Sequence, residues 1–305
     1  MGRLDNRVAI VTGAGRGLGR AHAEFLAREG ACVVINDLVT DPDGYTGLQS
    51  PASEVAAAIV GGGGRAIASN HDVADWNAAA EMIHLAIETF GGLHVLVNNA
   101  GILRDRTIAN MSEAEWDAVI RVHLKGHAAP THHAMKYWRE RSKAGHEVRA
   151  SIIHTSSISG LVGNFGQANY TAAKLGIVGL SMVAALEGKG YGVRSNTVAP
   201  SGRTRLATDG TPGGNMLFSA PLNPSDFDPW DPGNVSPLIG WLAGEGCPAT
   251  AQIFQVIGRR IRVFSMPSLA HELVNEGRWT LEALDQTLAS AMLETPSISQ
   301  FIIAK

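Results

Sequence analysis

The chain is poor in cysteine and in charge. Only two of its 305 residues are cysteines, and Cys32 and Cys247 fit neither a disulfide framework nor a metal site. Charged residues make up 17% of the chain and the formal net charge is −3, so neither nucleic acid nor a membrane is expected as a partner. The N-terminal segment lacks the apolar core of a signal sequence, which together with the scarce cysteines predicts a cytoplasmic protein.

Long apolar runs are also missing. The longest, residues 175–186, is shorter than the roughly 20 residues that a membrane-spanning helix needs, and it contains two glycines. The chain instead has 45% hydrophobic residues and 35 glycines, many of them at the ends of short apolar runs. This composition favours a folded protein with a sizeable core and tight turns.

Short runs rich in β-branched residues alternate with segments of helical period. Strands are predicted over residues 7–13, 31–37, 65–70, 93–101, 149–157, 193–200 and 252–258. Helices are predicted over residues 18–29, 52–60, 75–90, 112–140, 169–188, 236–244 and 280–293. Strands that alternate with helices pair in parallel through right-handed crossovers, and continuously apolar strands are covered on both faces. The prediction is an α/β fold: a single doubly wound Rossmann-type domain with a parallel seven-stranded sheet and helices on both faces.

The domain is expected to span residues 1–264 and to be followed by a C-terminal extension, residues 265–305. Within the domain, residues 203–232 are rich in Pro, Gly, Asp and Asn, which predicts a loop that closes over a substrate. Ser112 and Glu115 form the Ser-x-x-Glu pattern of a capping box and predict the start of the helix over 112–140.

A glycine-rich turn, TGAGRGLGRA, follows the first predicted strand and begins the first helix. Gly13, Gly17 and Gly19 permit a tight turn, close approach of the backbone to a phosphate, and close packing of helix on strand. The free amide groups at the start of the helix favour the pyrophosphate of a dinucleotide. A turn with a purely structural role is the alternative.

Asp37 ends the second predicted strand, where a carboxylate can accept hydrogen bonds from the hydroxyls of an adenosine ribose. The same carboxylate would repel the 2′-phosphate of NADP. Arg16 in the glycine-rich turn points the other way, because a guanidinium can bind that phosphate. Asp37 is placed closer to the ribose, so NAD is preferred to NADP.

Tyr170 and Lys174 lie four residues apart in GQANYTAAKLG, on one face of a predicted helix. A tyrosine beside a lysine on a helix surface is the simple alternative. A lysine ammonium within about 4–6 Å can instead lower the pKa of a phenol by roughly 1–3 units. Tyr170 would then be a usable base for an alcohol proton, and an acid in the reverse direction.

The spacing Thr-Gly-x-x-x-Gly-x-Gly at 12–19, NNAG at 98–101, and Ser157 thirteen residues before Tyr170 together resemble the short-chain dehydrogenase/reductase superfamily over residues 5–258. The segments VVINDL, NNAGILRDR, RVHLKGH and GNFGQANYTAAKLG are most similar to the hydroxyacyl-CoA dehydrogenase module of peroxisomal multifunctional enzymes of type 2 and to related actinobacterial dehydrogenases. Taken together, these motifs are highly specific.

The resemblance implies roles for individual residues. Ser157 would hold the substrate oxygen, Tyr170 would be the general acid/base, and Lys174 would bind the nicotinamide ribose and act on Tyr170. His123 stands where the superfamily commonly has a catalytic asparagine. The type 2 multifunctional module is similar in having a histidine at this position. Asn98 would support the centre of the sheet. The residues expected at the cofactor are Gly13, Arg16, Gly17, Leu18, Gly19, Asp37, Asp72, Val73, Asn99, Ala100, Gly101, Tyr170, Lys174, Pro200 and Thr204.

Two other segments depart from the superfamily pattern. The usual Pro-Gly after the sixth strand reads PSGRTR here, and Thr204 is assigned to the nicotinamide carboxamide across that difference. The usual glycine-rich ending near the seventh strand reads VIGRRIRV.

The predicted function is the NAD-dependent interconversion of a secondary alcohol and a ketone, on a 3-hydroxyacyl-CoA or steroid-like substrate. An NADPH-linked reductase of small carbonyls and a non-catalytic, nucleotide-sensing scaffold are the alternatives. The resemblance implies a homo-oligomer, a dimer or a tetramer with the tetramer preferred, formed through the helices over 112–140 and 169–188.

No metal is expected. His123 and His127 have a spacing found in zinc sites, but the sequence offers neither a glutamate between them nor a third ligand. The acidic segment 226–234 lacks the spacing of a calcium loop.

Overall fold

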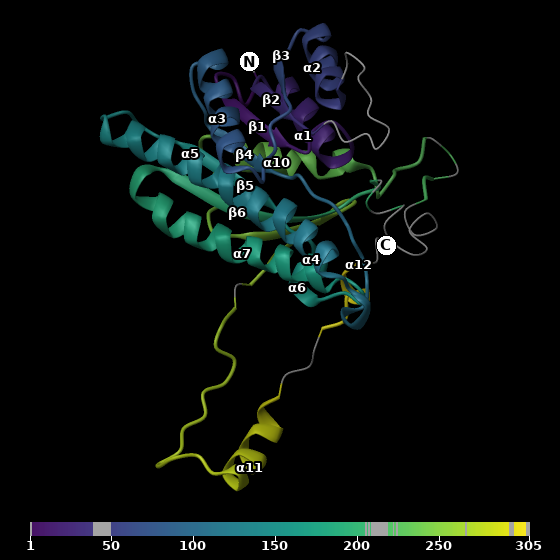
Figure 1. Cartoon of the computed structure of the whole chain (residues 1–305), viewed down its shortest axis with the longest axis vertical. Helices are drawn as coiled ribbons and strands as arrows, with labels where there is room; N and C mark the ends of the chain where they lie inside the picture. The colour runs from purple at the N-terminus through teal and green to yellow at the C-terminus, as the bar shows by residue number, and fades with distance from the viewer. Residues whose placement is uncertain are drawn as a thin grey trace.

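One sheet of eight strands forms the centre of the protein in its computed structural model (Figure 1). The structure describes residues 2–38, 50–204, 206, 208, 219–221, 223, 225–265, 267–292 and 296–302. In space the strands follow the order β3-β2-β1-β4-β5-β6-β7-β8. Their bounds are β1 Val8–Thr12, β2 Cys32–Asn36, β3 Arg65–Ser69, β4 Val95–Asn98, β5 Ala150–Thr155, β6 Val193–Ser201, β7 Ile253–Ile257 and β8 Arg260–Phe264. The first six strands have the 3-2-1-4-5-6 order of a doubly wound Rossmann-type sheet, which confirms the predicted fold class.

The eighth strand corrects the prediction of a parallel seven-stranded sheet. Strands β1 to β7 pair in parallel, whereas β8 turns back and pairs antiparallel with β7. Gly258 begins the turn with a φ of +53°, in the left-handed region. The segment after it, RIRVF, alternates charged and apolar residues, as an edge strand tolerates and a buried parallel strand does not.

Helices cover both faces of the sheet. Helices α1, α2 and α10 pack on one face, and α3, α5 and α7 pack on the other (Figure 1). Their bounds are α1 Gly17–Arg28, α2 Pro51–Gly61, α3 Trp76–Phe90, α5 Gly126–Lys143, α7 Ala168–Gly188 and α10 Ser236–Ala243. The shorter helices are α4 Glu113–Ile120, α6 Ile158–Val162 and α12 Ser299–Ile302, and α11 covers Leu281–Ala291.

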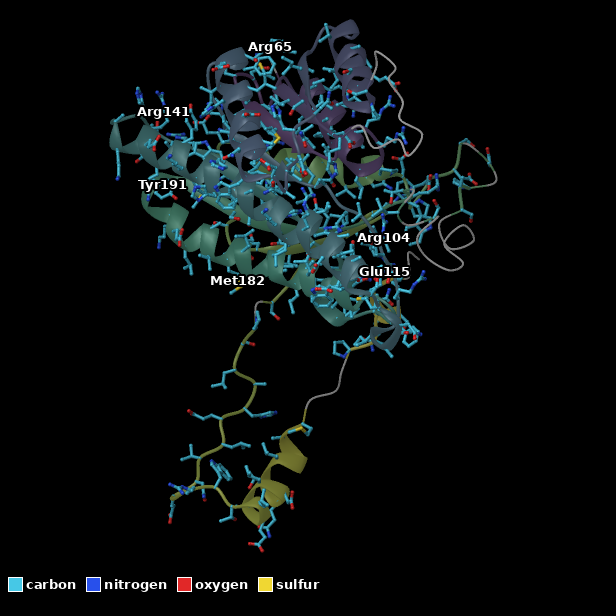
Figure 2. The ribbon with its side chains drawn as sticks, viewed as in Figure 1. Arg65, Arg104, Glu115, Arg141, Met182 and Tyr191 are labelled. Carbon is cyan, nitrogen blue, oxygen red and sulfur yellow. The ribbon has the colours of Figure 1, made fainter. Side chains whose placement is uncertain are left out.

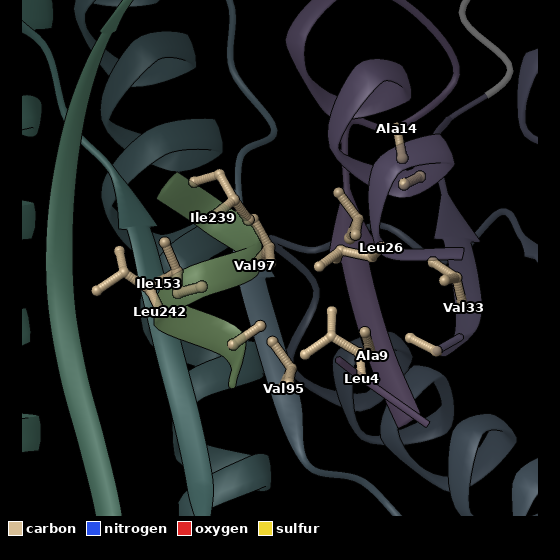
Figure 3. Packing of buried hydrophobic residues seen from close by; sticks show 14 of the residues in the cluster. Leu4, Ala9, Ala14, Leu26, Val33, Val95, Val97, Ile153, Ile239 and Leu242 are labelled. Carbon is tan, nitrogen blue, oxygen red and sulfur yellow. The ribbon is translucent and has the colours of Figure 1, made fainter. Parts of the chain in front are cut away.

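The core on the first face joins the parallel strands to α1 and α10. Figure 3 shows Ala9, Val97 and Ile153 of β1, β4 and β5 facing Leu26 of α1 and Ile239 of α10. All five side chains are buried. This packing brings the start of α1, with its glycine-rich turn, over the carboxyl ends of the central strands.

The long helix predicted over 112–140 is interrupted in the structure. Its capping box is confirmed, because Ser112 accepts from the Glu115 backbone and Glu115 accepts from the Ser112 backbone. The helix then widens into a π-helical turn, η2, over Arg121–Lys125 before α5 begins. Pro130 lies inside α5, one turn after η2, and has no N–H to donate to the Gly126 carbonyl. Wide turns of this kind are frequent at functional sites.

The segment Ala168–Tyr191 is long and apolar enough to cross a membrane, by its length and a mean hydropathy of 1.3. Most of it is α7, whose residues Ala173, Ile177 and Val178 are buried in the fold. The helix is part of the protein core, and core helices often have the length and hydropathy of a membrane-spanning helix.

The C-terminal extension leaves the body after β8 and returns to it. Figure 1 shows α11 well apart from the sheet. The chain comes back at α12, where the carbonyl oxygen of Phe301 accepts from Gln255 Nε2 at 3.1 Å and from Arg262 Nη1 at 3.0 Å. Both ends of the extension are therefore fixed at the β7–β8 edge.

Candidate active site

Tyr170 and Lys174 lie one turn apart near the start of α7, as predicted. Lys174 is 2% exposed, and its Nζ donates to the Thr155 carbonyl at the end of β5 over 2.6 Å. The same nitrogen lies 5.5 Å from the centroid of the Tyr170 ring. A Cβ added at Gly160 would lie 2.6 Å from Lys174 Cβ, so glycine lets α6 approach α7 closely. The lysine is thus an internal group and not a solvated surface charge.

Ser157 joins this pair from the residue before α6. Its Oγ caps the helix by accepting from the Ser159 backbone at 3.2 Å. A hydrogen bond between the side chains of Ser157 and Tyr170 favours the phenolate form. The structure therefore brings together three of the four residues that the sequence predicted to be catalytic, and the fourth is His123.

Burial controls the proton affinities of the pair. It raises the pKa of Tyr170 to about 12, against the opposing effect of the Ser157 hydrogen bond and with a smaller contribution from Asp105. Burial also lowers the pKa of Lys174 to about 7. The expectation of a lowered pKa for Tyr170 is corrected here, because the penalty of burying the charged phenolate outweighs the Ser157 hydrogen bond.

His123 lies in η2, at the place that the sequence comparison matched to a catalytic asparagine. Its ring meets the Tyr170 ring edge to face, with the centroids 5.1 Å apart and the planes at 87°. Its Nε2 is 2.7 Å from the Ile102 carbonyl oxygen. Burial, and then the charge of Lys174, hold the pKa of His123 well below its usual value. His123 is accordingly a neutral imidazole that packs on Tyr170 and holds the chain after β4.

The glycine-rich turn has the geometry of a dinucleotide cradle. Gly13 and Gly17 have φ values of +62° and +53°, which glycine adopts readily. A Cβ at Gly19 would lie 2.1 Å from the Gly13 carbonyl oxygen. Arg16, the exposed residue before α1, provides no side-chain cap, so the first amide groups of α1 remain available to a phosphate.

Asn99 and Ala100 fasten this turn to the end of β4. The Asn99 side chain donates to the Thr12 and Gly13 carbonyl oxygens at 3.0 and 3.2 Å. The backbone amides of Asn99 and Ala100 donate to Thr12 Oγ1 at 2.9 and 3.1 Å. Gly101 follows against the His123 ring, where a Cβ would lie 2.3 Å from Cε1. The cofactor residues predicted from NNAG thus connect the cradle to the catalytic pair.

Two predicted cofactor carboxylates are bonded within the protein. Asp37 Oδ2 accepts from the Gly15 backbone at 2.8 Å, so this carboxylate lies against the glycine-rich turn. Asp72 accepts from the Ala74 backbone at 2.8 Å and forms an ion pair with Arg121. Val73, which follows Asp72 in the chain, is buried.

The remaining predicted cofactor residues lie on the other side of the turn. Pro200 is in β6, and Thr204 follows that strand. A Cβ at Gly17 would lie 3.2 Å from Thr204 Cγ2, which places Thr204 beside the cradle. Leu18 lies beside Gly202, because a Cβ added at Gly202 would lie 3.4 Å from Leu18 Cδ2. Much of the predicted loop 203–232 lies outside the described residues.

Sequence analysis missed several residues that build the site. Asn169 Nδ2 donates to the Arg104 and Glu115 carbonyl oxygens at 3.0 and 3.1 Å, and Figure 2 shows these two residues close together. Gln167 donates to Asp105 Oδ2 at 2.8 Å. The signal was present in part, because Gln167 and Asn169 are two of the polar residues of GQANYTAAK. Asp105, Arg104 and Glu115 lie more than fifty residues from them and have no pattern of their own.

Within the part of the chain that the structure describes, no group of three or more His, Cys, Asp or Glu residues is arranged to hold a metal ion. The glycine-rich turn, Asn99 and the Tyr170–Lys174 pair fit a nicotinamide dinucleotide. The turn has no side chains that would block a pyrophosphate, and the buried acid/base pair lies beside it.

Comparisons with known proteins agree with this geometry. The family model described as short chain dehydrogenase matches residues 7–210. The hydroxyacyl-CoA dehydrogenase ChsB1 of Mycobacterium tuberculosis is 40% identical over 293 residues, which cover 93% of this chain and 88% of that protein. Peroxisomal multifunctional enzyme type 2 of Mus musculus is 41% identical over 255 residues, 83% of this chain but only 32% of the mouse protein.

Solved structures show the same relationship. A crystal structure of a short chain dehydrogenase from Mycobacterium avium matches with a TM-score of 0.84 and 47% identity, over 95% of each chain. Full-length peroxisomal multifunctional enzyme type 2 from Drosophila melanogaster matches with a TM-score of 0.72 and 30% identity, over 97% of this chain and 48% of that one. The chain belongs to the short-chain dehydrogenase family, whose members are oxidoreductases that act on CH–OH groups with a nicotinamide dinucleotide.

Proposed function

We propose that the protein interconverts a secondary alcohol and a ketone on a 3-hydroxyacyl-CoA or steroid-like substrate, with NAD as cofactor and Tyr170 as the general acid/base. The observation that carries the proposal is the meeting of Ser157, Tyr170 and buried Lys174 beside the glycine-rich turn.

The residues divide the chemistry between them. A bound nicotinamide dinucleotide supplies the hydride acceptor for oxidation and the hydride donor for reduction. Ser157 Oγ holds the substrate oxygen, so that its distance and angle to Tyr170 are set before the reaction. Tyr170 takes the alcohol proton during oxidation and returns a proton to the carbonyl oxygen during reduction. Lys174, when protonated, stabilises the phenolate, and the Thr155 carbonyl holds its ammonium in place.

Asp37 supports the preference for NAD. Its carboxylate lies at the carboxyl end of β2 against Gly15, next to the place where the adenosine ribose of a bound dinucleotide would lie. A 2′-phosphate would bring further negative charge to that carboxylate. Turnover with NAD should exceed turnover with NADP by at least about tenfold, and Asp37→Ser should reduce the ratio. The NADPH-linked reductase is favoured if NADP supports the faster reaction.

The substrate class rests on relatives whose names include hydroxyacyl-CoA dehydrogenase and the multifunctional enzyme of peroxisomes. It is tested by following nucleotide reduction with 3-hydroxyacyl-CoA thioesters of increasing chain length, a steroid alcohol and short secondary alcohols. The proposal expects the highest kcat/KM among the thioesters or the steroid. Preference for the short alcohols would reject this assignment.

Tyr170→Phe tests the acid/base. We expect kcat to fall by at least about a thousandfold with little change in nucleotide affinity, because the variant keeps the ring and loses only the proton carrier. The matched control is Tyr191→Phe, since the Tyr191 hydroxyl donates to Met135 Sδ, at 3.6 Å, and to no other group in the described part of the chain. A Tyr170→Phe enzyme that oxidises alcohols as fast as the parent would favour the nucleotide-sensing scaffold.

We also propose a homo-oligomer, with a tetramer as the expected form, that works in the cytoplasm. Leu175, Val183 and Leu186 lie along the outer face of α7 and are 53%, 49% and 75% exposed. An apolar stripe of this size on a core helix is suited to packing against a second copy.

A further inference from the structure

Behind Lys174, between α5 and the sheet, lies a buried cluster of polar residues that the proposed mechanism does not use. His123, His127 and Thr131 follow one another at intervals of four residues on one helical stripe. Asn98 and His154, register partners at the ends of β4 and β5, complete the cluster. All five are at most 4% exposed. The group is called the histidine cluster below.

Hydrogen bonds link four of these side chains. Asn98 Nδ2 donates to Thr131 Oγ1 at 3.1 Å and lies 3.4 Å from His154 Nδ1. His127 Nδ1 lies 3.3 Å from His154 Nδ1, and the two rings are stacked with centroids 5.5 Å apart. The cluster is therefore a connected network inside the protein.

His154 Nδ1 has two neighbours, Asn98 Nδ2 and His127 Nδ1, and each neutral ring has a single N–H and a single lone pair. Whichever ring nitrogen carries the proton, Nε2 of both histidines keeps a hydrogen-bonding capacity that no described group uses. Both histidines are neutral, because burial lowers the pKa of His154 to about 3 and that of His127 well below its usual value.

Four polar atoms of the cluster have no hydrogen-bond partner among the described residues: Asn98 Oδ1, His123 Nδ1, His127 Nε2 and His154 Nε2. They are four of the seven such buried atoms in the described part of the chain. Leaving a buried donor or acceptor without a partner costs about 1–3 kcal/mol. Buried water typically makes about three hydrogen bonds to such groups. Water both donates and accepts hydrogen bonds, so it can satisfy such a set.

The cluster reaches Lys174 through the backbone. His154 directly precedes Thr155, whose carbonyl accepts from Lys174 Nζ. An ammonium has three N–H donors, and this contact uses one of them. The charge of Lys174 contributes to the lowered pKa of His123, His127 and His154, which places all three rings within its electrostatic reach.

We propose that His127 and His154, with Asn98 and Thr131, bind water inside the protein behind Lys174, and that this hydrated cluster holds the ammonium form of the lysine. His127 and His154 are thus positioning residues for the acid/base pair. The inference rests on the proposed function for its catalytic consequence, but the water site and its effect on Lys174 stand apart from the substrate.

The other titratable groups near Lys174 are few. Tyr170 is on its own helix, His123 is in η2, and Asp105, after β4, acts on Tyr170. Helix α6 has no titratable residue, and Arg194 of β6 is held at the far end of that strand by the Leu242 and Gly244 carbonyl oxygens. On α4, Glu115 forms an ion pair with Arg106 and not with Lys174.

The test uses His127→Phe and His127→Gln. Phenylalanine keeps the ring volume and removes both nitrogens, whereas glutamine keeps an acceptor for the water. His132→Gln is the control, since His132 is on the same helix and exposed. The pKa of Lys174 is measured in the nucleotide-free protein by NMR of labelled lysine, and the pH profile of kcat for alcohol oxidation is measured alongside.

We expect His127→Phe to lower the pKa of Lys174 by about one unit, which makes the ammonium form that stabilises the Tyr170 phenolate about tenfold rarer above that pKa and reduces kcat for oxidation about tenfold there. His127→Gln should restore most of both, and His132→Gln should match the parent. A folded His127→Phe protein with the parent's lysine pKa and profile would overturn the inference.

A crystal structure of the parent tests the water directly, even if His127→Phe does not fold. Ordered water within hydrogen-bond distance of His127 Nε2 and His154 Nε2 is expected. Both nitrogens without water would refute the site. If the parent oxidises no alcohol, the proposed function fails, while the NMR and crystallographic results still decide the inference.

Discussion

Buried histidines make the folded protein sensitive to acid. His22 and His154 both have a folded pKa of about 3, against 6.5 for an exposed histidine, because burial penalises the charged ring. Between these values the unfolded chain binds more protons than the folded one. The contribution of these two histidines to stability is therefore fully present above pH 6.5 and is lost as the pH drops from 6.5 toward 3.

At pH 5 each histidine should cost about 2 kcal/mol of the free energy of unfolding relative to pH 7. Urea unfolding at the two pH values measures the loss. His22→Gln, which can keep a hydrogen bond to Ser236 Oγ, should remove about half of this part of the pH dependence. His84→Gln, at an exposed position, is the matched control. Equal unfolding free energies for the parent at pH 7 and pH 5 would contradict the assignment.

Tyr170 predicts opposite pH profiles for the two directions. Oxidation needs the phenolate, and burial raises the pKa of Tyr170 to about 12, so the rate of oxidation should rise with pH from 7 to 10. Reduction uses the protonated phenol and should not rise over that range. Initial rates with matched substrates in both directions check this. An oxidation rate that falls above pH 8, while the protein stays folded, would rule out Tyr170 as the base.

At the scale of residues, the sequence predicted which side chains form the site better than it predicted their burial and pKa values. Ser157, Tyr170 and Lys174 were found because they share a short, specific pattern. The direction of the Tyr170 pKa shift was wrong, because burial depends on α6, η2 and the strand ends, which lie far away in the sequence. The pairing of His127 with His154 could not be predicted for the same reason.

At the scale of elements, the turn before α1 depends on the absence of side chains. An alanine Cβ at position 19 would lie 2.1 Å from the Gly13 carbonyl oxygen, so Gly19→Ala must push the turn away from α1. We expect a loss of about 1–3 kcal/mol in stability and at least about tenfold weaker nucleotide binding. Calorimetric titration with nucleotide and urea unfolding measure the two effects.

Gly61→Ala is the matched control, because nothing lies within 4 Å of a Cβ added at the end of α2. Its stability and nucleotide affinity should stay close to those of the parent. Unchanged nucleotide affinity in Gly19→Ala would show that the turn does not hold the phosphates.

Element types were predicted well where their period was clear. The strands that alternate with long helices were found, with ends shifted by a few residues. β8 was missed because its five residues follow a two-residue turn and carry two arginines. The π-helical turn η2 between α4 and α5 was missed because the sequence was read as one continuous helix over residues 112–140.

At the scale of the whole molecule, the exposed face of α7 predicts assembly. Leu186 is 75% exposed, and a glutamate there would bury a charge in any interface that α7 forms. Leu186→Glu should convert a tetramer into a smaller species in size-exclusion chromatography with light scattering. Val60→Glu places the same charge on α2, at a residue 53% exposed, and should leave the mass unchanged. A monomeric parent would refute the oligomer itself.

The extension after β8 has a consequence for how the protein can change over evolution. Its two ends meet where the rings of Phe264 and Phe301 lie with centroids 5.5 Å apart, so the intervening residues form an excursion from one fixed point. Doubling the length of such an excursion adds only about 0.6 kcal/mol of closure entropy. Insertions and deletions are therefore cheap here, and homologues should differ most in size at this point while the sheet remains unaltered.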